Sequence, residues 1–373
     1  MKHRIVILGA GYAGTHAAGR LARRLHPGDA EITLVNAEPD FVERIRLHQL
    51  ATGQDLRPRP LRDLYAKTHV TVRTARVTAV DVNRRTVQLS DGELPYDTLV
   101  YALGSTATAD GHHVASRPAA LRVRDRLREL AAGSTVRVVG GGLTAIEAVT
   151  EIAESRPDLT VSIAAREVVG GWLSDKARQH LARAFTRLGV TVHDRTEIAP
   201  GDMTADLTVW TTGFAAHPIA AASGLTVAGT GQIEVDATMR SVSHPDVYAV
   251  GDAGFAAGPG DKPLRMSCAS GVPMAWQAAD AIAARLTGRE VKTIPLRYYG
   301  QCISLGRHDG IVQWVTPDDR AKQSALTGAA AARVKEFVCA GAAWGTAHPT
   351  VLVVRRHRVR TGRYESAQAS SSF

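Results

Sequence analysis

Short apolar runs that stop at glycine recur along this chain. The first, residues 5–8, is followed by Gly9, Gly11 and Gly14 and then by small residues that favour a helix. This pattern predicts a buried parallel strand, a tight turn and the start of a helix. In such a unit Gly9 permits the turn, Gly11 lets a pyrophosphate approach the backbone, and Gly14 lets helix and strand pack closely. We therefore expect a dinucleotide whose pyrophosphate lies at the helix N-terminus, where free N–H groups and the helix dipole favour an anion.

The same pattern returns at residues 137–153. A strand there is followed by Gly140 and Gly142, with Ala145 in the place of the third glycine, and then by a helix. One such turn can arise by chance, whereas repetition of the whole unit within a chain is a much stronger signal. The repetition predicts a second dinucleotide-binding unit.

The strand after the second turn bears on the choice of nucleotide. It covers residues 161–164 and ends at Ala165 and Arg166, where an acid would reject a 2′-phosphate. A cation in place of that acid favours NADPH over NADH. The alternative is that Arg166 is a surface residue with no ligand.

Two further strand ends carry candidate ligands of the first dinucleotide. The strand predicted at residues 32–35 ends at Asn36, about twenty residues after the first turn, so Asn36 or the nearby Glu38 must serve as the ribose-binding residue. A later apolar run is closed by Gly251 and Asp252. An acid at the end of a buried strand is costly without a partner, and Asp252 is suited to accept hydrogen bonds from a ribityl chain.

The pattern between these units predicts strands. Apolar and polar residues alternate over 70–82 and 87–89, which indicates a meander with a turn between the two stretches. Two other buried strands end at Gly104 and Gly213, where we expect the backbone to pass close to a neighbouring group.

The last third of the chain is less regular. A helix is expected from Gly271, with Pro273 in its first turn and Gly288 after its end. Strand-like pieces occupy residues 298–315. The tail from Arg355 is basic and then Ser-rich, so we expect it to be loose.

Composition narrows the class of protein. The 373 residues are enough for two or three domains, and 45 Lys and Arg against 36 Asp and Glu give a net charge of +9, which suits anionic cofactors. The arginines are scattered and aromatic residues are only 5%, so no nucleic-acid partner is expected. Cys268, Cys302 and Cys339 form no C-x-x-C pair, which indicates neither a disulfide framework nor a metal site. A cytoplasmic protein is expected, with at most a peripheral membrane contact, because no apolar stretch approaches the roughly 20 residues that span a bilayer.

Taken in order, these motifs resemble those of a known protein family. The ordered set GAGYAG, YDTLVYALG, GGGLTAIE and DVYAVGD resembles the flavoprotein reductases with two dinucleotide domains, over roughly residues 3–315. Within that family the chain looks most like the type II NADH dehydrogenases, which are quinone reductases. That similarity rests on ITLVNAEPDFVERIRLHQLATG, on Glu147 in GGGLTAIE and on SLGRHDGIVQWV.

The resemblance implies FAD as cofactor and NADPH or NADH as hydride donor to flavin N5. Glu147 matches a family glutamate near nicotinamide and flavin, and His48 and Gln49 are candidate positioning residues for the acceptor; an ordinary helix acid and a solvated face are the alternative interpretations. The Val77 backbone would hold the adenine, and the helix with Pro273 would point its N-terminus at the flavin. Resemblance and strand ends together give these cofactor-binding candidates: Gly9, Gly11, Gly14, Asn36, Glu38, Arg44, Val77, Gly104, Gly140, Gly142, Ala145, Arg166, Gly213, Gly251, Asp252 and Pro273.

The departures from the family leave the electron acceptor open. No cysteine occurs in residues 41–53, where disulfide reductases of this fold carry their redox pair, so relay to a dithiol is not expected. Of the paired glutamines in the quinone motif only Gln277 remains, with Pro273 in the place of the other. A quinone-like acceptor, a specific metabolite and a flavin-binding sensor with little turnover are the three alternatives.

The expected fold class is α/β with two Rossmann-like domains, the second inserted in the first, and a small C-terminal α+β domain. We predict an FAD domain from residues 1–112 and 232–297, an NAD(P) domain from 113–231, and a cap from 298–373. The cap could shape the acceptor site or the interface of a homodimer.

Overall fold

The computed structural model describes residues 1–108, 110–199, 201, 204–348, 350 and 357–359. Apart from residues 357–359, the basic tail predicted to be loose lies outside the described residues. None of the described helices is both long and apolar enough to cross a bilayer.

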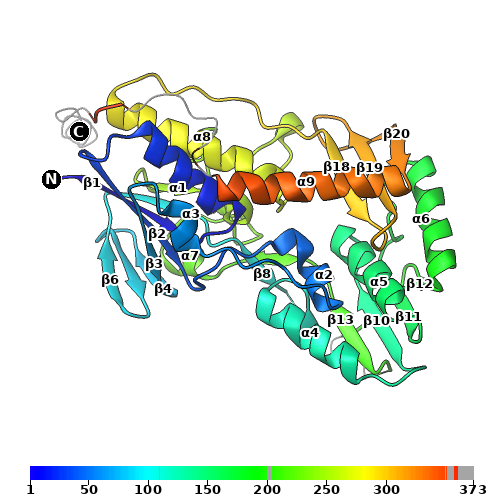
Figure 1. Ribbon diagram of the computed structural model, residues 1–373. Coiled ribbons are helices and arrows are strands. Elements are labelled where there is room, and N and C mark those ends of the chain that lie inside the picture. Colours follow the sequence, from blue (N-terminus) through cyan, green and yellow to red (C-terminus); the bar gives the residue numbers. More distant parts are fainter. Residues whose placement is uncertain (109, 200, 202–203, 349, 351–356, 360–373) are drawn as a thin grey trace.

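The N-terminal part is built on a five-stranded parallel sheet (Figure 1). Its strand order is β16-β7-β1-β2-β3, and the first glycine turn joins β1 to the helix α1. The long helix α8 packs against α1. The bounds are β1 (His3–Leu8), α1 (Tyr12–Arg24), β2 (Ala30–Asn36), β3 (Val70–Thr74), β7 (Thr98–Tyr101), β16 (Val247–Ala249) and α8 (Cys268–Thr287).

One predicted strand belongs to a different sheet. The expected meander included residues 70–74, but β3 pairs in parallel with β2, and Ala75 N continues that pairing by donating to Asn36 O at 2.9 Å. Only β4 (Val77–Asp81), β5 (Thr86–Leu89) and β6 (Gly92–Pro95) form the antiparallel meander. The break at Ala75 and Arg76 separates the two sheets, which alternation of apolar residues alone does not reveal.

A second parallel sheet carries the second glycine turn. Its order is β12-β11-β10-β13-β9, and the turn joins β10 to α5. The chain enters and leaves this part through β8 (Ser105–Ala107) and β14 (Phe214–Ala216), which pair with each other. The α/β fold with two parallel dinucleotide-binding sheets is therefore confirmed. The bounds are β9 (His112–His113), α4 (Arg117–Glu129), β10 (Thr135–Val139), α5 (Leu143–Ser155), β11 (Thr160–Ala164), α6 (Asp175–Leu188), β12 (Thr191–His193) and β13 (Leu207–Trp210).

The exact domain division stays a prediction. Ile219 in α7 (Ile219–Ala222) and Leu225 pack in one apolar cluster with Val77 and Val80 of β4, beside the first sheet. The return of the chain to the first part therefore lies near β14. Shorter elements complete the two parts: η1 (Arg44–Arg46), α2 (Leu47–Ala51), α3 (Leu61–Tyr65), β15 (Ile233–Glu234), η2 (Gly251–Ala253), β17 (Gly254–Phe255) and η3 (Pro259–Asp261).

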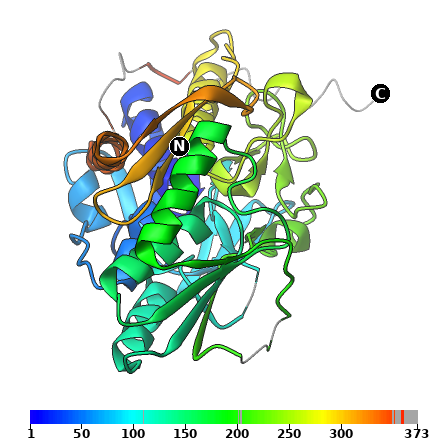
Figure 2. The same ribbon diagram turned by 90° about the vertical axis from the view of Figure 1, so that its right-hand side faces the viewer.

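The C-terminal part contains a long helix that the sequence analysis did not predict. Three antiparallel strands, β18 (Gly300–Ser304), β19 (Gly310–Val315) and β20 (Ala321–Thr327), are followed by α9 (Ala329–Ala347). This sheet lies between α9 and α6 (Figure 2). From there α9 runs across the molecule to contact α1, so it links the cap to the first sheet (Figure 1).

The start of α8 also differs from the prediction. The helix begins at Cys268 because Ser267 caps it, with Ser267 Oγ accepting from Ser270 N at 3.4 Å. Pro273 therefore lies in the second turn rather than the first. The predicted end is confirmed, because Gly288 closes the helix with a φ of +66°.

The turn between β18 and β19 docks on α5 through its backbone. Ser304 N donates to Glu147 Oε1 at 3.1 Å, and Gly306 N donates to Thr150 Oγ1 at 3.2 Å. Gly306 has a φ of +78°, and a Cβ there would lie 1.9 Å from Glu154 Oε2. The Glu154 carboxylate ends a flexible side chain and can shift, so it is the positive φ that favours glycine at this turn between cap and second sheet.

Candidate functional site

The first glycine turn has the shape that a pyrophosphate needs. A Cβ on Gly9, whose φ is +94°, would lie 2.3 Å from Ala102 O, and a Cβ on Gly14 would lie 1.8 Å from Gly9 O. Gly11 instead faces open space and caps α1 without any side-chain hydrogen bond. The free N–H groups at this helix end fit the anionic part of a dinucleotide.

Asn36 is occupied in holding that turn. Its Oδ1 accepts from Ala10 N at 2.9 Å and its Nδ2 donates to Glu38 O at 2.8 Å. Glu38, whose backbone oxygen accepts that hydrogen bond, is exposed. Ribose binding by either residue stays a prediction, with the Glu38 side chain the freer of the two.

A second group of predicted residues meets beside the first turn. Ser105 Oγ donates to Asp252 Oδ2 at 2.6 Å, and Arg44 Nη1 lies 3.7 Å from the same carboxylate. A Cβ on Gly104 would lie 3.5 Å from Arg44 Nη1, and the Arg44 guanidinium stacks over the Phe214 ring. The structure thus brings Arg44, Gly104 and Asp252 together, and their binding of the cofactor stays a prediction.

The N-terminal end of α8 packs against α1 and the turn at Gly251. A Cβ on Gly251 would lie 3.0 Å from Ala13 Cβ, and a Cβ on Gly271 would lie 3.2 Å from Gly251 Cα. Three backbone segments, α1, η2 and α8, therefore meet at closest approach. The residues that start α8 are Cys268 to Ser270, and Pro273 lies one turn further inside, so its predicted place at the helix end was wrong.

The second glycine turn repeats the geometry of the first. A Cβ on Gly140, with a φ of +136°, would lie 2.5 Å from Thr211 Oγ1, whereas Gly142 faces open space and caps α5 without a side-chain bond. Ala145 is fully buried on α5. This turn fits a second dinucleotide, because the same free N–H groups are available.

The remaining cofactor candidates lie at the edges of these two turns. Arg166 is exposed at the end of β11, and Gly213, with a φ of +124°, follows β13. Val77 begins β4 and is buried. Their contacts to nucleotides stay predictions.

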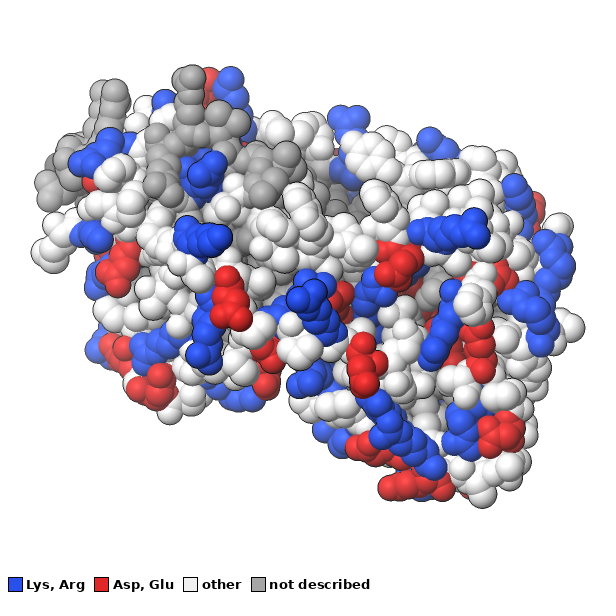
Figure 3. Space-filling model, in the orientation of Figure 1, with Lys and Arg blue, Asp and Glu red and all other residues white. Residues whose placement is uncertain are grey.

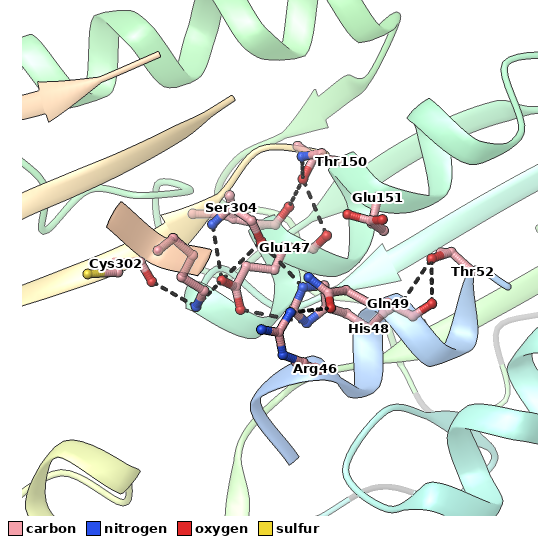
Figure 4. Close-up of polar contacts among 12 residues, drawn as sticks. Arg46, His48, Gln49, Thr52, Glu147, Thr150, Glu151, Cys302 and Ser304 are labelled. Atoms are coloured by element: carbon pink, nitrogen blue, oxygen red, sulfur yellow. Dashed lines mark hydrogen bonds and ion pairs between the residues drawn. The ribbon is translucent and has the colours of Figure 1, made fainter. Parts of the chain in front are cut away.

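A buried polar network connects α2, α5, β18 and α9 (Figure 4). Glu147 of α5 forms an ion pair with Lys335 of α9, Nζ to Oε1 at 2.8 Å. Ser304 of β18 donates its N–H and its hydroxyl to the same carboxylate oxygen. His48 of α2 contacts the other carboxylate oxygen, Nδ1 to Oε2 at 3.9 Å, and lies with Nε2 at 3.3 Å from Ser304 Oγ. The predicted pair Glu147 and His48 is thus brought together.

The charges of this network follow from burial and pairing. Burial alone would raise the pKa of Glu147, but the Lys335 ammonium and the Ser304 N–H hold it below its usual range. Burial opposes the charge of Lys335 as well, and the Glu147 carboxylate outweighs it and raises the Lys335 pKa. Burial lowers the pKa of the His48 imidazole to about 4, so this ring is neutral near pH 7.

Sequence reasoning missed Lys335 and Ser304. Lys335 lies within an Ala-rich apolar segment, on the same helical face as the buried Ala331 and Cys339. A lone lysine on the apolar stripe of a helix is the available signal for a buried ion pair. Ser304 carries no such signal, because its role depends on where β18 docks.

Gln49 has a different set of contacts from His48. Its Oε1 accepts from Arg46 Nη1 at 3.1 Å, and Arg46 in turn pairs with Glu336 of α9, Nη2 to Oε1 at 2.6 Å. The side chain therefore faces the link between α2 and α9. A catalytic role of Gln49 stays a prediction.

Comparison with known proteins decides the family. Residues 3–283 match the pyridine nucleotide-disulphide oxidoreductases. The chain belongs to this family. It is accordingly an FAD-dependent oxidoreductase that uses NADH or NADPH, and both glycine turns fit that pair of dinucleotides.

Individual relatives have low sequence identity to this chain, but their similarity extends over most of its length. It is 28% identical over 347 residues to an NADH dehydrogenase-like protein of Mycobacterium tuberculosis, covering 81% of this chain and 86% of that protein. It is 24% identical over 360 residues to a type II NADH:quinone oxidoreductase of Staphylococcus haemolyticus, covering 83% and 89%. The solved sulfide:quinone oxidoreductase of Aquifex aeolicus has a TM-score of 0.78 and 18% identity, covering 100% of this chain and 95% of that one.

The two kinds of glycine in the first turn have separable roles, which a matched pair of variants should reveal. Gly14→Ala places its Cβ against the backbone of Gly9, so we expect the free energy of unfolding to fall by about 3 kcal/mol or more. Gly11→Ala has an ordinary φ of −73° and open space, so the fold should persist while FAD content falls. Denaturant unfolding and flavin absorbance measure the two effects. A Gly11→Ala protein with full FAD content would contradict the proposed approach of the pyrophosphate.

The neutral His48 makes stability depend on pH. The unfolded state binds a proton below pH about 6.5 whereas the folded state resists it down to about 4, so acidification through this window favours unfolding. We expect His48→Gln to lose less stability than wild type between pH 7 and pH 4, by up to about 3 kcal/mol. Denaturant unfolding at several pH values measures this difference. Parallel pH profiles for the two proteins would show that His48 is not held neutral.

Proposed function

We propose that this protein passes electrons from NADPH through FAD directly to a quinone-like acceptor. The observation that carries the proposal is the buried network of Glu147, Lys335, Ser304 and His48, which lies where the second dinucleotide unit, the cap and α2 meet. The quinone named for the relatives from Staphylococcus haemolyticus and Aquifex aeolicus supports this acceptor class.

The chain's own residues would position the reactants. The turns at Gly11 and Gly142 would hold the two pyrophosphates on helix N-termini, and Asp252 would accept hydrogen bonds from the FAD side. Bound FAD supplies the hydride acceptor that passes two electrons on. Alignment of the reactants matters more for such a transfer than acid catalysis, so Glu147 would act by holding its neighbours in place.

A direct transfer, without a redox disulfide, is supported by the state of the cysteines. All three are free, and none lies in residues 41–53. Burial raises the pKa of each thiol, to about 11 for Cys339. Protonated buried thiols are poor nucleophiles, which does not suit a dithiol relay.

A specific metabolite is the second candidate acceptor, and Gln277 favours it. This glutamine, the one that remains of the paired quinone motif, is buried, and both ends of its amide are hydrogen-bonded to the backbone. Its Nε2 donates to Ala237 O at 2.8 Å, and its Oε1 accepts from Ile294 N at 3.1 Å. Gln277 thus links the backbone at Ala237 to the backbone at Ile294, a structural role that competes with quinone binding.

We also propose a peripheral membrane contact through α9. The helix exposes Phe337, Val338 and Trp344, with exposed fractions of 78%, 46% and 53%. Uncharged side chains cover much of this face, between scattered charges (Figure 3). The sequence after α9 is rich in arginine from Arg355 onward, and basic residues beside an apolar helix face favour an anionic lipid surface.

Anaerobic stopped-flow spectroscopy tests the proposed electron path. NADPH should bleach the flavin rapidly, and a short-chain quinone should then reoxidise it. Glu147→Gln should slow flavin reduction about tenfold or more because Lys335 loses its partner and the site loses its alignment. The exposed Glu129→Gln of α4 removes an acid from the same part of the chain and should behave as wild type.

The outcomes separate the candidate functions. Reduction by NADPH without reoxidation by quinone would direct the search to a metabolite. No reduction at all would leave only a flavin-binding sensor. An unchanged rate for Glu147→Gln would remove this residue from the chemistry.

Vesicle co-sedimentation tests the membrane contact. Wild type should sediment with vesicles that contain anionic lipid, and much less with neutral vesicles. Replacing Phe337 and Trp344 by serine removes two large apolar anchors, so most of this binding should be lost while flavin reduction stays normal. Equal sedimentation of the double variant and wild type would refute a contact through this face.

A further inference from the structure

The end of β11 is joined to the loop that follows β12. The two strands are paired in parallel up to Ala164 and His193. Beyond that pair, Thr196 N donates to Ala165 O at 2.8 Å, and Arg195 N lies 3.4 Å from Glu167 O. These two hydrogen bonds flank Arg166, so the backbones of Arg166 and Arg195 are held side by side.

This corner lies against the second glycine turn. A Cβ on Gly141 would lie 3.0 Å from Ala165 Cβ, which places the end of β11 in contact with the turn expected to hold a pyrophosphate. In dinucleotide-binding units the adenosine ribose lies at the end of this strand. Arg166 and Arg195 therefore lie where a dinucleotide-binding unit recognises the substituent on the ribose 2′-position.

Both arginines are exposed and uncommitted. Neither guanidinium has a hydrogen-bond or ion-pair partner among the residues that the structure describes, and both side chains are exposed. Two acids share the corner, Glu167 and Asp194. The Asp194 carboxylate accepts from Val169 N at 2.8 Å, which ties it to the loop, whereas Glu167 is exposed.

The backbone of Arg195 is held in an unfavourable conformation. Its φ is +52°, a region that glycine adopts more easily than arginine. A side chain in this region costs of the order of 1 kcal/mol and persists only where the surroundings enforce it. An arginine here is better explained by a use for its guanidinium than by the needs of the turn.

We propose that Arg166 and Arg195 form a two-arginine clamp for the 2′-phosphate of NADPH. Arg195 is then a specificity-determining residue, supplied by the neighbouring strand rather than by β11 itself. Phosphate suits such a clamp because each planar guanidinium can donate two hydrogen bonds to its oxygens. This inference rests on the proposed use of NADPH and adds a second residue to it.

Calorimetric titration of the FAD-loaded protein tests the clamp without any redox reaction. The two probes are adenosine 2′,5′-bisphosphate and 5′-AMP, which differ only in the 2′-phosphate. Wild type should bind the bisphosphate more tightly. Arg195→Ala should weaken the bisphosphate about tenfold and leave AMP unchanged, and Arg195→Lys should keep part of the preference. The exposed Arg183→Ala of α6 removes the same charge from the same sheet unit and should behave as wild type.

Each other outcome has a defined meaning. If Arg195→Ala binds the bisphosphate like wild type while Arg166→Ala does not, the clamp is refuted and the NADPH proposal stands on Arg166 alone. If wild type itself shows no preference for the bisphosphate, the proposed use of NADPH fails together with the clamp. Arg195→Gly relieves the positive φ, so it should fold at least as well as wild type and still lose the preference, which separates recognition from folding.

Discussion

The ion pair between Glu147 and Lys335 is the interaction on which the candidate site depends. Glu147 is buried and the Lys335 side chain is only 14% exposed, and a charge removed from water costs several kcal/mol unless a partner and hydrogen bonds compensate it. Here the compensation comes from Ser304, which donates twice to Glu147, and from Cys302 O, which accepts from Lys335 Nζ at 3.1 Å. The carboxylate is therefore satisfied only when α5, β18 and α9 are assembled together.

This constraint explains why α9 lies where it does. The helix must bring Lys335 over α5, and the next residue, Glu336, pairs with Arg46 beside α2. The β18–β19 turn, docked by Gly306, completes the same contact from the cap. Two dinucleotide-binding units and the cap thus share one polar centre, to which α2, α5, β18 and α9 contribute.

Local patterns predicted the parts of this arrangement that local chemistry decides. Both strand–turn–helix units were predictable from the spacing of their glycines between an apolar strand and a helix. The structure adds that Gly14 contacts Gly9 O within the turn, whereas Gly9 and Gly140 are confined by Ala102 and Thr211, at the ends of β7 and β13. The parallel pairing of β3 and the start of α8 at Cys268 were not predictable, because they depend on a break at Ala75 and on a serine cap. Lys335 could not be assigned from spacing alone, since its partner lies 188 residues away, on the inserted unit.

A double-mutant cycle on the buried pair tests the central claim most directly. The free energy of unfolding would be measured by denaturant for wild type, Glu147→Gln, Lys335→Met and the double variant. If the pair is the shared polar centre, each single change leaves an uncompensated buried charge and costs about 3 kcal/mol, and the double variant loses no more than either single one. Losses that simply add would mean that the two side chains contribute independently, which would contradict the account.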